Sequence, residues 1–314
     1  MWLRSSVSPL GTGGQATSGT RVQARGRSLV GAYNLPVIQY QELTITLPDG
    51  YEAYARYWPA DPCRGAVLSL HGIQSHGGWF EASAGHLQRA GFAVLQPDRR
   101  GSGRNLLDRG HAASAEQLVA DAFACLDALV ERTNAPRPQV MGISWGGKLA
   151  AAMHATDPNR IAGLALVTPG LFPRSGVSQA EKFRIGCAMI SNPEKSFDIP
   201  LNVPELLARD PSWIRYLQQD PLQLHQATAG FFLASRRMDR TIRALAKATP
   251  IPLHVFLAKD EGIIDNDETC AFIRGLGWNT WSVTTYERSR HTIEFDEDRD
   301  RFLADLVNSL SATR

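Results

Sequence analysis

The segment that most constrains the fold of this chain is Val140-Met-Gly-Ile-Ser-Trp-Gly-Gly147. A short apolar run leads into the pattern G-I-S-W-G, and a small-residue stretch, Lys148-Leu-Ala-Ala-Ala-Met153, follows it. A strand, a sharp turn and a helix in this order form an elbow that presents a serine at its tip. Gly142 and Gly146 meet the steric demand, because side chains two positions from Ser144 would collide with the neighbouring strand or helix. The pattern predicts Ser144 as a nucleophile. The alternative is a glycine-rich turn without chemistry.

The composition is that of an ordinary globular protein, and it argues against several classes of partner. The 314 residues are 43% hydrophobic and 20% charged, and 33 basic against 31 acidic residues give a formal net charge of +2. This balance predicts neither nucleic acid nor an anionic membrane as the partner. No apolar run approaches the length of a membrane span, and the first residues lack the apolar core of a secretory signal.

The cysteines predict a reducing environment. All four are widely separated, and they form neither a C-x-x-C pair nor a Cys/His cluster. Disulfides and a structural zinc site are therefore not expected. A cytoplasmic location is the prediction that follows.

The sequence divides into three parts. Residues 1–38 carry several arginines among Gly, Ser, Thr and Gln, with no acidic residue before Glu42, which predicts a flexible basic arm. Short apolar strands alternate with helices over 39–168 and again over 249–314, which predicts one α/β core with a mostly parallel sheet. The proline-rich stretch 169–248 is expected to form a helical cap over Ser144, with one helix covering 222–235. The alternative for this stretch is ordinary surface decoration.

A serine hydroxyl needs a base, and His291 is the candidate. It follows the strand expected over 281–286 and precedes the last helix, so its loop should lie at the same edge of the sheet as the elbow. A carboxylate from the loop 259–266 should orient the imidazole. Spacing favours Glu261, because a glycine and an apolar pair follow it and let the loop re-enter the core. Asp260 is the rival, and Asp265 is expected to cap the next helix.

The backbone also has a predicted role. The N–H of Trp145, directly after the serine, and the N–H of Ile73, in the loop after the strand 66–70, are expected to form an oxyanion hole. His71 and His76 in that loop raise metal binding as an alternative. Two histidines with no nearby acid or cysteine are a poor ligand set, so we expect them to shape the loop. No metal and no organic cofactor is predicted.

Four segments together carry a family resemblance: His71-Gly-Ile-Gln-Ser-His-Gly-Gly-Trp-Phe80, Pro97-Asp-Arg-Arg-Gly-Ser-Gly103, Gly142-Ile-Ser-Trp-Gly-Gly147 and His291-Thr-Ile-Glu-Phe-Asp296. From about Tyr40 to its end the chain resembles the α/β-hydrolase superfamily, and within it the monoacylglycerol lipase/lysophospholipase-like branch of serine hydrolases. The first two segments are much more specific than G-x-S-x-G alone.

The resemblance implies a mostly parallel eight-stranded sheet flanked by helices, with a helical cap inserted between late strands. It implies Ser144 as nucleophile, His291 as general base, and the Ile73 and Trp145 amides as the oxyanion hole. The acid of the family is usually an aspartate, and an ungapped match places Glu261 at its position. Glutamate here departs from the family pattern.

The function implied is hydrolysis of carboxylic esters, of the monoacylglycerol, lysophospholipid or another small acyl-ester type, through an acyl-enzyme on Ser144. The expected partner is a small-molecule ester, with peripheral contact with lipid left open. The same residues would also serve an acyltransferase, a cofactor-free haloperoxidase or a carbon–carbon bond hydrolase. A non-catalytic binding module with this fold is the alternative from another class, and the complete set of candidate residues argues against it.

Overall fold

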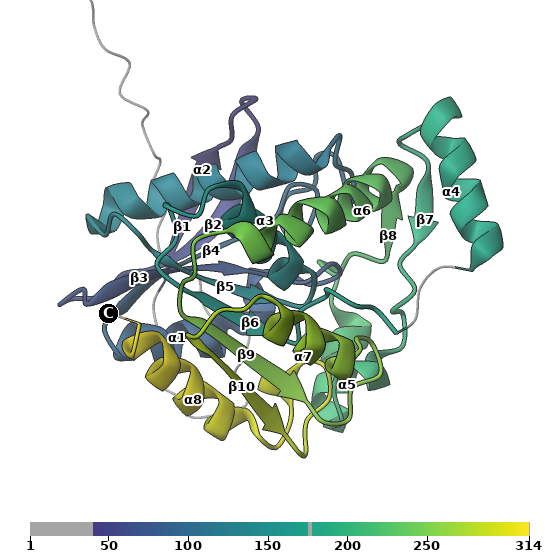
Figure 1. Ribbon diagram of the computed structural model, residues 1–314. Helices are drawn as coiled ribbons and strands as arrows, with labels where there is room; N and C mark the ends of the chain where they lie inside the picture. The colour runs from purple at the N-terminus through teal and green to yellow at the C-terminus, as the bar shows by residue number, and fades with distance from the viewer. Residues whose placement is uncertain (1–39, 175–177, 314) are drawn as a thin grey trace, which may run out of the picture.

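An eight-stranded sheet forms the centre of the protein, and all but two of its strand pairings are parallel (Figure 1). The computed structural model describes residues 40–174 and 178–313, so the predicted basic arm, residues 1–38, lies outside the described residues. The strands are β1 (Gln41–Thr46), β2 (Glu52–Trp58), β3 (Gly65–Leu70), β4 (Phe92–Pro97), β5 (Gln139–Ile143), β6 (Leu164–Val167), β9 (Leu253–Ala258) and β10 (Trp281–Tyr286). Their order across the sheet is β1-β2-β4-β3-β5-β6-β9-β10.

Burial along the strands reflects their place in the sheet. In β1, Leu43 and Ile45 are buried and alternate with exposed threonines, as in a strand with one face on the core. Every residue of β4, β5 and β6 is buried, because helices cover both faces of the middle of the sheet. This arrangement confirms the predicted α/β fold.

Helices lie on both sides of the sheet. Figure 1 shows α2 (Ala115–Thr133) and α3 (Trp145–Thr156) on one side and α1 (Glu81–Arg89) and α8 (Arg299–Ser311) on the other. The remaining core elements are α7 (Asn266–Gly275) and the short 3-10 turns η1 (Gly77–Phe80) and η4 (Ile293–Phe295). Ser114 caps the start of α2, since its hydroxyl accepts the N–H of Gln117 at 3.1 Å.

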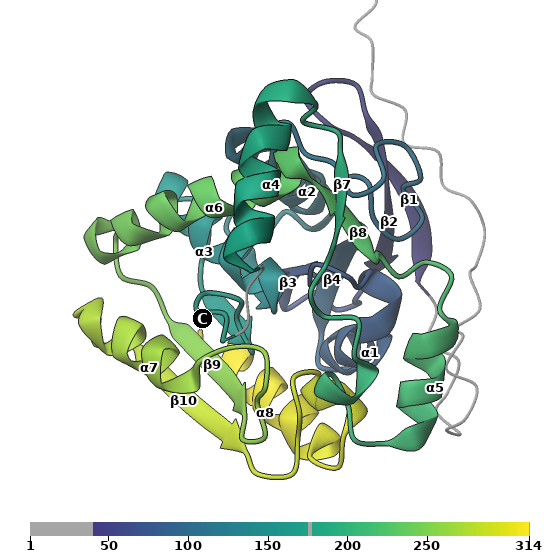
Figure 2. The same ribbon diagram turned by 90° about the vertical axis from the view of Figure 1, so that its right-hand side faces the viewer.

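The chain between β6 and β9 forms a separate set of elements beside the core (Figure 2). These are α4 (Gln179–Ser191), β7 (Ser196–Asp198), η2 (Pro204–Leu206), α5 (Pro211–Gln219), β8 (Gln226–Thr228), α6 (Ala229–Arg243) and η3 (Ala244–Lys247). Strands β7 and β8 pair as an antiparallel ribbon, so this segment is not purely helical.

The prediction of a helix over 222–235 is wrong about its position, since α6 spans Ala229–Arg243. Helix α6 begins only after Thr228, whose hydroxyl accepts the N–H of Phe231 at 3.2 Å. The residues before it are held by the core: the N–H of Leu224 donates to Gln74 O at 2.9 Å, and Arg109 donates to the carbonyl of Leu222 at 2.7 Å. Residues 226–228 are extended as β8 and pair with β7, so the helix begins only after them.

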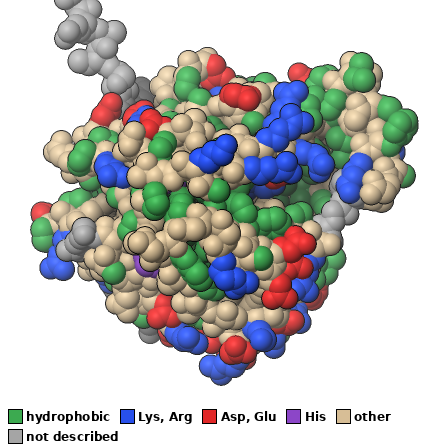
Figure 3. All heavy atoms as spheres, in the orientation of Figure 1, with side chains coloured by type: hydrophobic (Ala, Val, Ile, Leu, Met, Phe, Trp, Pro, Cys, Tyr) green, Lys and Arg blue, Asp and Glu red, His purple; other side chains and the backbone are tan. Residues whose placement is uncertain are grey.

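The outer end of the molecule is formed by α4. Figure 3 shows hydrophobic side chains there, and Phe183 and Ile190 on α4 are 73% and 91% exposed. No helix in the described ranges is both long and apolar enough to cross a bilayer. All four cysteines are free thiols.

Candidate active site

Ser144 lies at the tip of a strained turn between β5 and α3. Its φ of 53° and ψ of −119° place it among the rare residues other than glycine with positive φ. The turn also needs its glycines. A β-carbon on Gly142 would lie 2.5 Å from Gly146 O, and one on Gly146 would lie 2.1 Å from Leu70 O. Backbone packing at these distances leaves no room for any side chain.

The structure brings Ser144, His291 and Glu261 together. Nε2 of His291 is 2.8 Å from Ser144 Oγ, and Nδ1 of the same ring is 2.9 Å from Glu261 Oε2. The two residues behind the serine are buried, with 3% and 6% of their surface exposed. Because a carboxylate only accepts, Nδ1 carries the proton and Nε2 presents a lone pair to the serine hydroxyl. This arrangement can remove the proton from Ser144.

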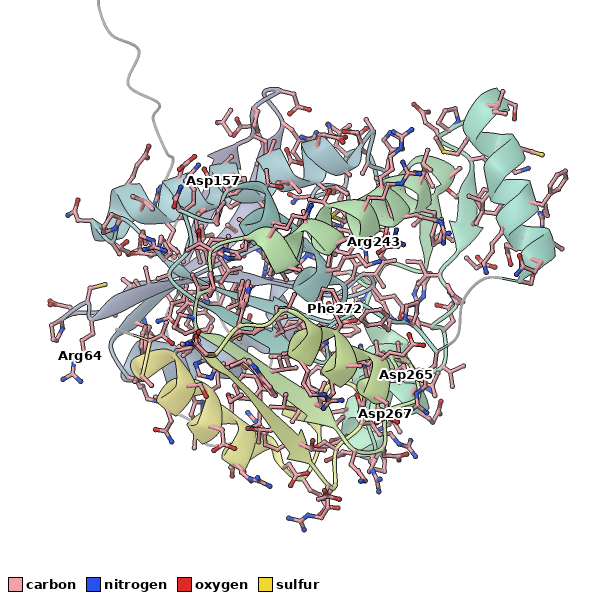
Figure 4. All side chains as sticks on the ribbon, viewed as in Figure 1. Arg64, Asp157, Arg243, Asp265, Asp267 and Phe272 are labelled. Atoms are coloured by element: carbon pink, nitrogen blue, oxygen red, sulfur yellow. The ribbon has the colours of Figure 1, made fainter. Side chains whose placement is uncertain are left out.

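The loop after β9 decides which acid reaches the imidazole. Glu261 Oε1 accepts the N–H of Ile263 at 2.8 Å, so the backbone of the loop holds the carboxylate. Asp260 points outward: it is exposed and pairs with Arg209 and Arg290 at 2.9 and 3.1 Å. Asp265 lies directly before α7 (Figure 4), and its side chain accepts the N–H of Glu268, as predicted for a cap.

Two further residues, neither of them predicted from the sequence, anchor the loop that carries His291. Thr168, at the end of β6, donates its hydroxyl to His291 O at 2.9 Å. Asp296 accepts the N–H of Arg290 at 2.7 Å and the N–H of Arg209, in the segment between β6 and β9, at 2.6 Å. In the sequence, Asp296 is distinguished only by lying five residues after His291. That spacing does not indicate that its side chain bonds the N–H groups of Arg290 and Arg209.

The predicted oxyanion loop passes directly beside the serine. A β-carbon on Gly72 would lie 3.3 Å from Ser144 Cβ, and the next residue, Ile73, lines the same pocket as Ser144 and His291. Trp145 is the first residue of α3, so its N–H belongs to the unsatisfied first turn of that helix. The two residues named for the oxyanion hole thus flank Ser144.

His71 and His76 hold this loop in place. His71 donates from Nδ1 to Gly72 O at 2.8 Å and accepts the N–H of Arg99 at Nε2 at 2.9 Å. Burial lowers the pKa of His71 to about 3, so the ring is neutral. His76 pairs with Asp220 at 2.9 Å, which ties the loop to the chain after α5. Within 40–174 and 178–313 no group of three or more His, Cys, Asp or Glu side chains could hold a metal ion.

A narrow pocket opens on Ser144 and His291. Phe80 and Ile143 of the core and Leu201 and Leu207 of the segment between β6 and β9 give it apolar walls. No acidic side chain lines it among the described residues. Its polar side chains besides Ser144 and His291 include Gln74 and Ser75, both 3% exposed.

The sheet order, the serine elbow after β5, and a histidine and an acid that follow later strands define an α/β-hydrolase fold. The sequence profile of the family described as serine aminopeptidase, S33, matches residues 61–298, and the chain belongs to this family. Its relatives include the monoacylglycerol lipase of Mycolicibacterium smegmatis, 24% identical over 261 residues that cover 82% of this chain and 91% of the relative. The monoglyceride lipase of Homo sapiens is 25% identical over 263 residues, covering 82% and 85%.

A solved structure shows the same fold. The crystal structure of Paleococcus ferrophilus monoacylglycerol lipase superimposes with a TM-score of 0.76 at 22% identity, covering 84% of this chain and 100% of that chain. Together with the family match, these similarities confirm the resemblance to the monoacylglycerol lipase-like branch of the α/β-hydrolases.

Proposed function

We propose that this chain hydrolyses carboxylic esters in two steps through an acyl-enzyme on Ser144. The observation that carries the proposal is the continuous hydrogen-bonded chain from Ser144 Oγ through His291 to Glu261, at 2.8 and 2.9 Å. The similarity to lipases supports carboxylic ester hydrolysis as the reaction class.

In the first step, Nε2 of His291 takes the proton of Ser144 while Oγ attacks the ester carbonyl carbon. The carbonyl oxygen becomes an oxyanion that accepts hydrogen bonds from the backbone N–H groups of Ile73 and Trp145. The intermediate collapses, and the alcohol leaves with the proton from His291. Glu261 keeps the ring in the correct tautomer and stabilises its cation.

In the second step, water takes the place of the alcohol. His291 removes a proton from the water as it attacks the acyl carbon, and His291 returns that proton to Ser144 Oγ when the second tetrahedral intermediate collapses. The products are the carboxylic acid and the free enzyme. An acyltransferase would differ only in the acceptor that enters at this point.

The pocket supports a substrate with an apolar acyl part and a hydroxyl-bearing alcohol. Its apolar walls suit an acyl or alkyl chain. Gln74 Oε1 and Ser75 Oγ have no hydrogen-bond partner within the described residues. A buried polar atom left unpaired costs roughly 1–3 kcal/mol, which a donor on the substrate would recover. A glycerol-like alcohol carries such donors, and this favours a monoacylglycerol-like ester.

The same lining argues against aminopeptidase activity, although the family description names one. An aminopeptidase has to bind the α-ammonium group of its substrate, and a buried cation needs a carboxylate partner. No acidic side chain lines this pocket in the described part of the chain.

We assign residues 169–248 as the cap over this pocket. Leu201 and Leu207 contribute to its walls, and Asp220 accepts hydrogen bonds from His76 and from the indole N–H of Trp79. These contacts support a cap that is part of the substrate site rather than surface decoration. Arm, core and cap boundaries, and a cytoplasmic location, stay predictions.

The test is hydrolysis of a p-nitrophenyl ester series from short to long acyl chains by wild type, Ser144→Ala and Ser191→Ala. Ser191 is an exposed serine at the end of α4 and serves as the matched control. We expect a chain-length optimum that Ser144→Ala abolishes and Ser191→Ala leaves intact. An amino acid p-nitroanilide series should show no comparable activity.

A folded wild type that cleaves no ester would overturn the ester hydrolase proposal. Fluorophosphonate labelling then separates the alternatives. A labelled Ser144 would indicate another acyl or carbon–carbon substrate, and an unlabelled one would indicate a non-catalytic module.

A further inference from the structure

The side chain of Arg99 lies behind the predicted oxyanion loop. Arg99 follows β4, and its Nη1 donates to Gly72 O at 3.2 Å while Nη2 donates to Ile73 O at 3.0 Å. One guanidinium therefore fastens two consecutive carbonyls of the loop beside Ser144.

The first of these hydrogen bonds acts on the predicted oxyanion donor itself. The carbonyl of Gly72 and the N–H of Ile73 belong to the same planar peptide group. Gly72 O accepts from Arg99 and also from His71 Nδ1, at 2.8 Å. Hydrogen bonds to the oxygen draw electron density from the nitrogen, which strengthens the N–H as a donor at the opposite side of the peptide. They also fix the plane, and so the direction, of that N–H.

Arg99 also contacts the residue that supplies the second donor. Its guanidinium carbon lies 4.7 Å from the centre of the Trp145 ring and 5.1 Å from that of Phe231, on the cap helix α6. The indole of Trp145 is held in turn by Ser235 on α6, through a hydrogen bond of 2.9 Å from Nε1. A single side chain thus touches both residues of the predicted oxyanion hole and the cap.

The charge of Arg99 is not balanced by an ion pair. No carboxylate forms one with it within residues 40–174 and 178–313, and its Nε has no hydrogen-bond partner there. The neighbouring Asp98 is engaged by Arg56 at 3.0 Å and by the N–H of Gly77 at 2.8 Å. Burial, together with repulsion from Arg109, lowers the pKa of Arg99 to about 9, so it is a cation at neutral pH.

We propose that Arg99 is a positioning residue for the oxyanion hole, which orients and polarises the Gly72–Ile73 peptide and adds positive charge behind the oxyanion. This inference rests on the proposed ester hydrolysis at Ser144. Stabilisation of developing charge by preorganised dipoles is strongest where water is excluded, which is the environment of this loop. Since the charge develops only in the transition state, Arg99 should raise kcat and leave KM almost unchanged.

Arg109 offers a matched control. Its guanidinium also donates to backbone carbonyls, Gly103 O at 2.8 Å and Leu222 O at 2.7 Å, and joins the core to the cap. Neither acceptor lies in the oxyanion loop. Removal of Arg109 should therefore cost structural hydrogen bonds of the same kind without changing the Gly72–Ile73 peptide.

The experiment compares wild type, Arg99→Met, Arg99→Lys and Arg109→Met in full-length protein. The readouts are kcat and KM for the best p-nitrophenyl ester, the inhibition constant of a trifluoromethyl ketone with the same acyl chain, and the thermal midpoint. Ser144 Oγ adds to the ketone carbonyl and an oxyanion forms. The affinity for the ketone therefore measures how strongly the oxyanion hole stabilises that charge. Since losing one direct oxyanion donor costs ~10²–10³ in kcat, the indirect loss in Arg99→Met should be on the order of tenfold.

We expect the ketone affinity of Arg99→Met to weaken by the same factor as kcat, with KM within about twofold of wild type. Arg99→Lys keeps the charge, so its kcat and ketone affinity should fall between those of wild type and Arg99→Met. Arg109→Met should lower the thermal midpoint while kcat stays near wild type. An unchanged kcat in Arg99→Met, an equal loss in Arg109→Met, or an unchanged ketone affinity would each overturn the inference.

If Arg99→Met does not fold, Arg99→Lys tests the inference alone. A positioning role requires that kcat and the ketone affinity of Arg99→Lys fall in parallel while KM stays constant. Should wild type show neither ester hydrolysis nor fluorophosphonate labelling, the proposed function itself fails. If wild type is active and kcat of Arg99→Met is unchanged, the proposed function stands and only the role of Arg99 is overturned.

Discussion

Glu261 holds the imidazole of His291 with both carboxylate oxygens, which lie 2.9 and 3.0 Å from Nδ1. Oε1 of the same carboxylate also accepts the N–H of Ile263 at 2.8 Å, so the backbone of the loop holds the acid in place. A glutamate in place of the usual aspartate of the family is thus compatible with a short contact to the histidine. The longer side chain also reaches back to its own loop.

This relationship separates the two neighbouring acids experimentally. Glu261→Gln should lower kcat on the order of 10³–10⁴-fold, because the amide can favour the wrong imidazole tautomer and carries no charge to stabilise the cation. Asp260→Asn, which alters only an exposed pair with Arg209 and Arg290, should leave kcat within about threefold of wild type. Steady-state kinetics on one ester measures both. Equal losses in the two variants would contradict the assignment of Glu261.

The unpaired polar atoms in the pocket predict a preference for hydroxyl-bearing alcohols. Ser75→Ala should reduce kcat/KM for a monoacylglycerol by roughly 5–30-fold while a methyl ester of the same acid is hardly affected, because only the glyceryl group carries donors and acceptors for the Ser75 hydroxyl. Effects on folding and on the triad cancel in the ratio of the kcat/KM values that one variant shows for the two substrates. A ratio unchanged from wild type would show that the alcohol lies elsewhere.

Two glycines should respond to alanine in opposite directions. Gly146→Ala would place a β-carbon 2.1 Å from Leu70 O, and it should destabilise the protein by more than about 3 kcal/mol or prevent folding. Gly186, on the exposed face of α4, has nothing within 4 Å of the same position, and alanine there should stabilise by about 0.5–1 kcal/mol through helix propensity. Thermal unfolding of both variants checks the pair. A mild effect of Gly146→Ala would contradict the close packing at the elbow.

The buried carboxyl of Glu294 predicts that stability declines as the pH rises from about 4.5 to about 7. The side chain is buried next to Ser83, and burial raises the pKa of Glu294 to about 7 although hydrogen bonds from Ser83 lower it. Between its unfolded pKa and this value the folded state binds more protons than the unfolded state, so the free energy of unfolding falls as pH rises. The total loss for a group of this kind is roughly 3 kcal/mol, complete above pH 7.

Glu294→Gln removes the titration and keeps the shape. Urea unfolding of wild type and this variant at several values between pH 4.5 and 8 should show wild type losing stability relative to the variant as the pH rises. Two parallel pH profiles would show that Glu294 ionises in the folded protein as it does in water.

Local patterns were enough to predict much of the site. A glycine two positions to each side of Ser144, with a strand before and a helix after it, specifies the elbow, because the steric demand is met within a few residues of the chain. Chain order then selects His291 and the loop of Glu261, since loops that follow parallel strands meet at one edge of a sheet. The alternation of apolar strands and helices was enough to predict the fold class, because it too is visible in local stretches of the chain.

Contacts between distant segments decided the rest. Whether Glu261 or Asp260 faces the histidine depends on how the loop after β9 packs, which buries Glu261 and leaves Asp260 exposed. The late start of α6 depends on the hydrogen bonds that residues 222–224 form with Arg109 and Gln74 O, and on the pairing of β8 with β7. The position of Arg99 behind Gly72 and Ile73 joins segments that no periodicity links. Local sequence determined which residues could act at this site, and long-range packing determined which of them meet, because a hydrogen bond depends on distances that only the folded chain sets.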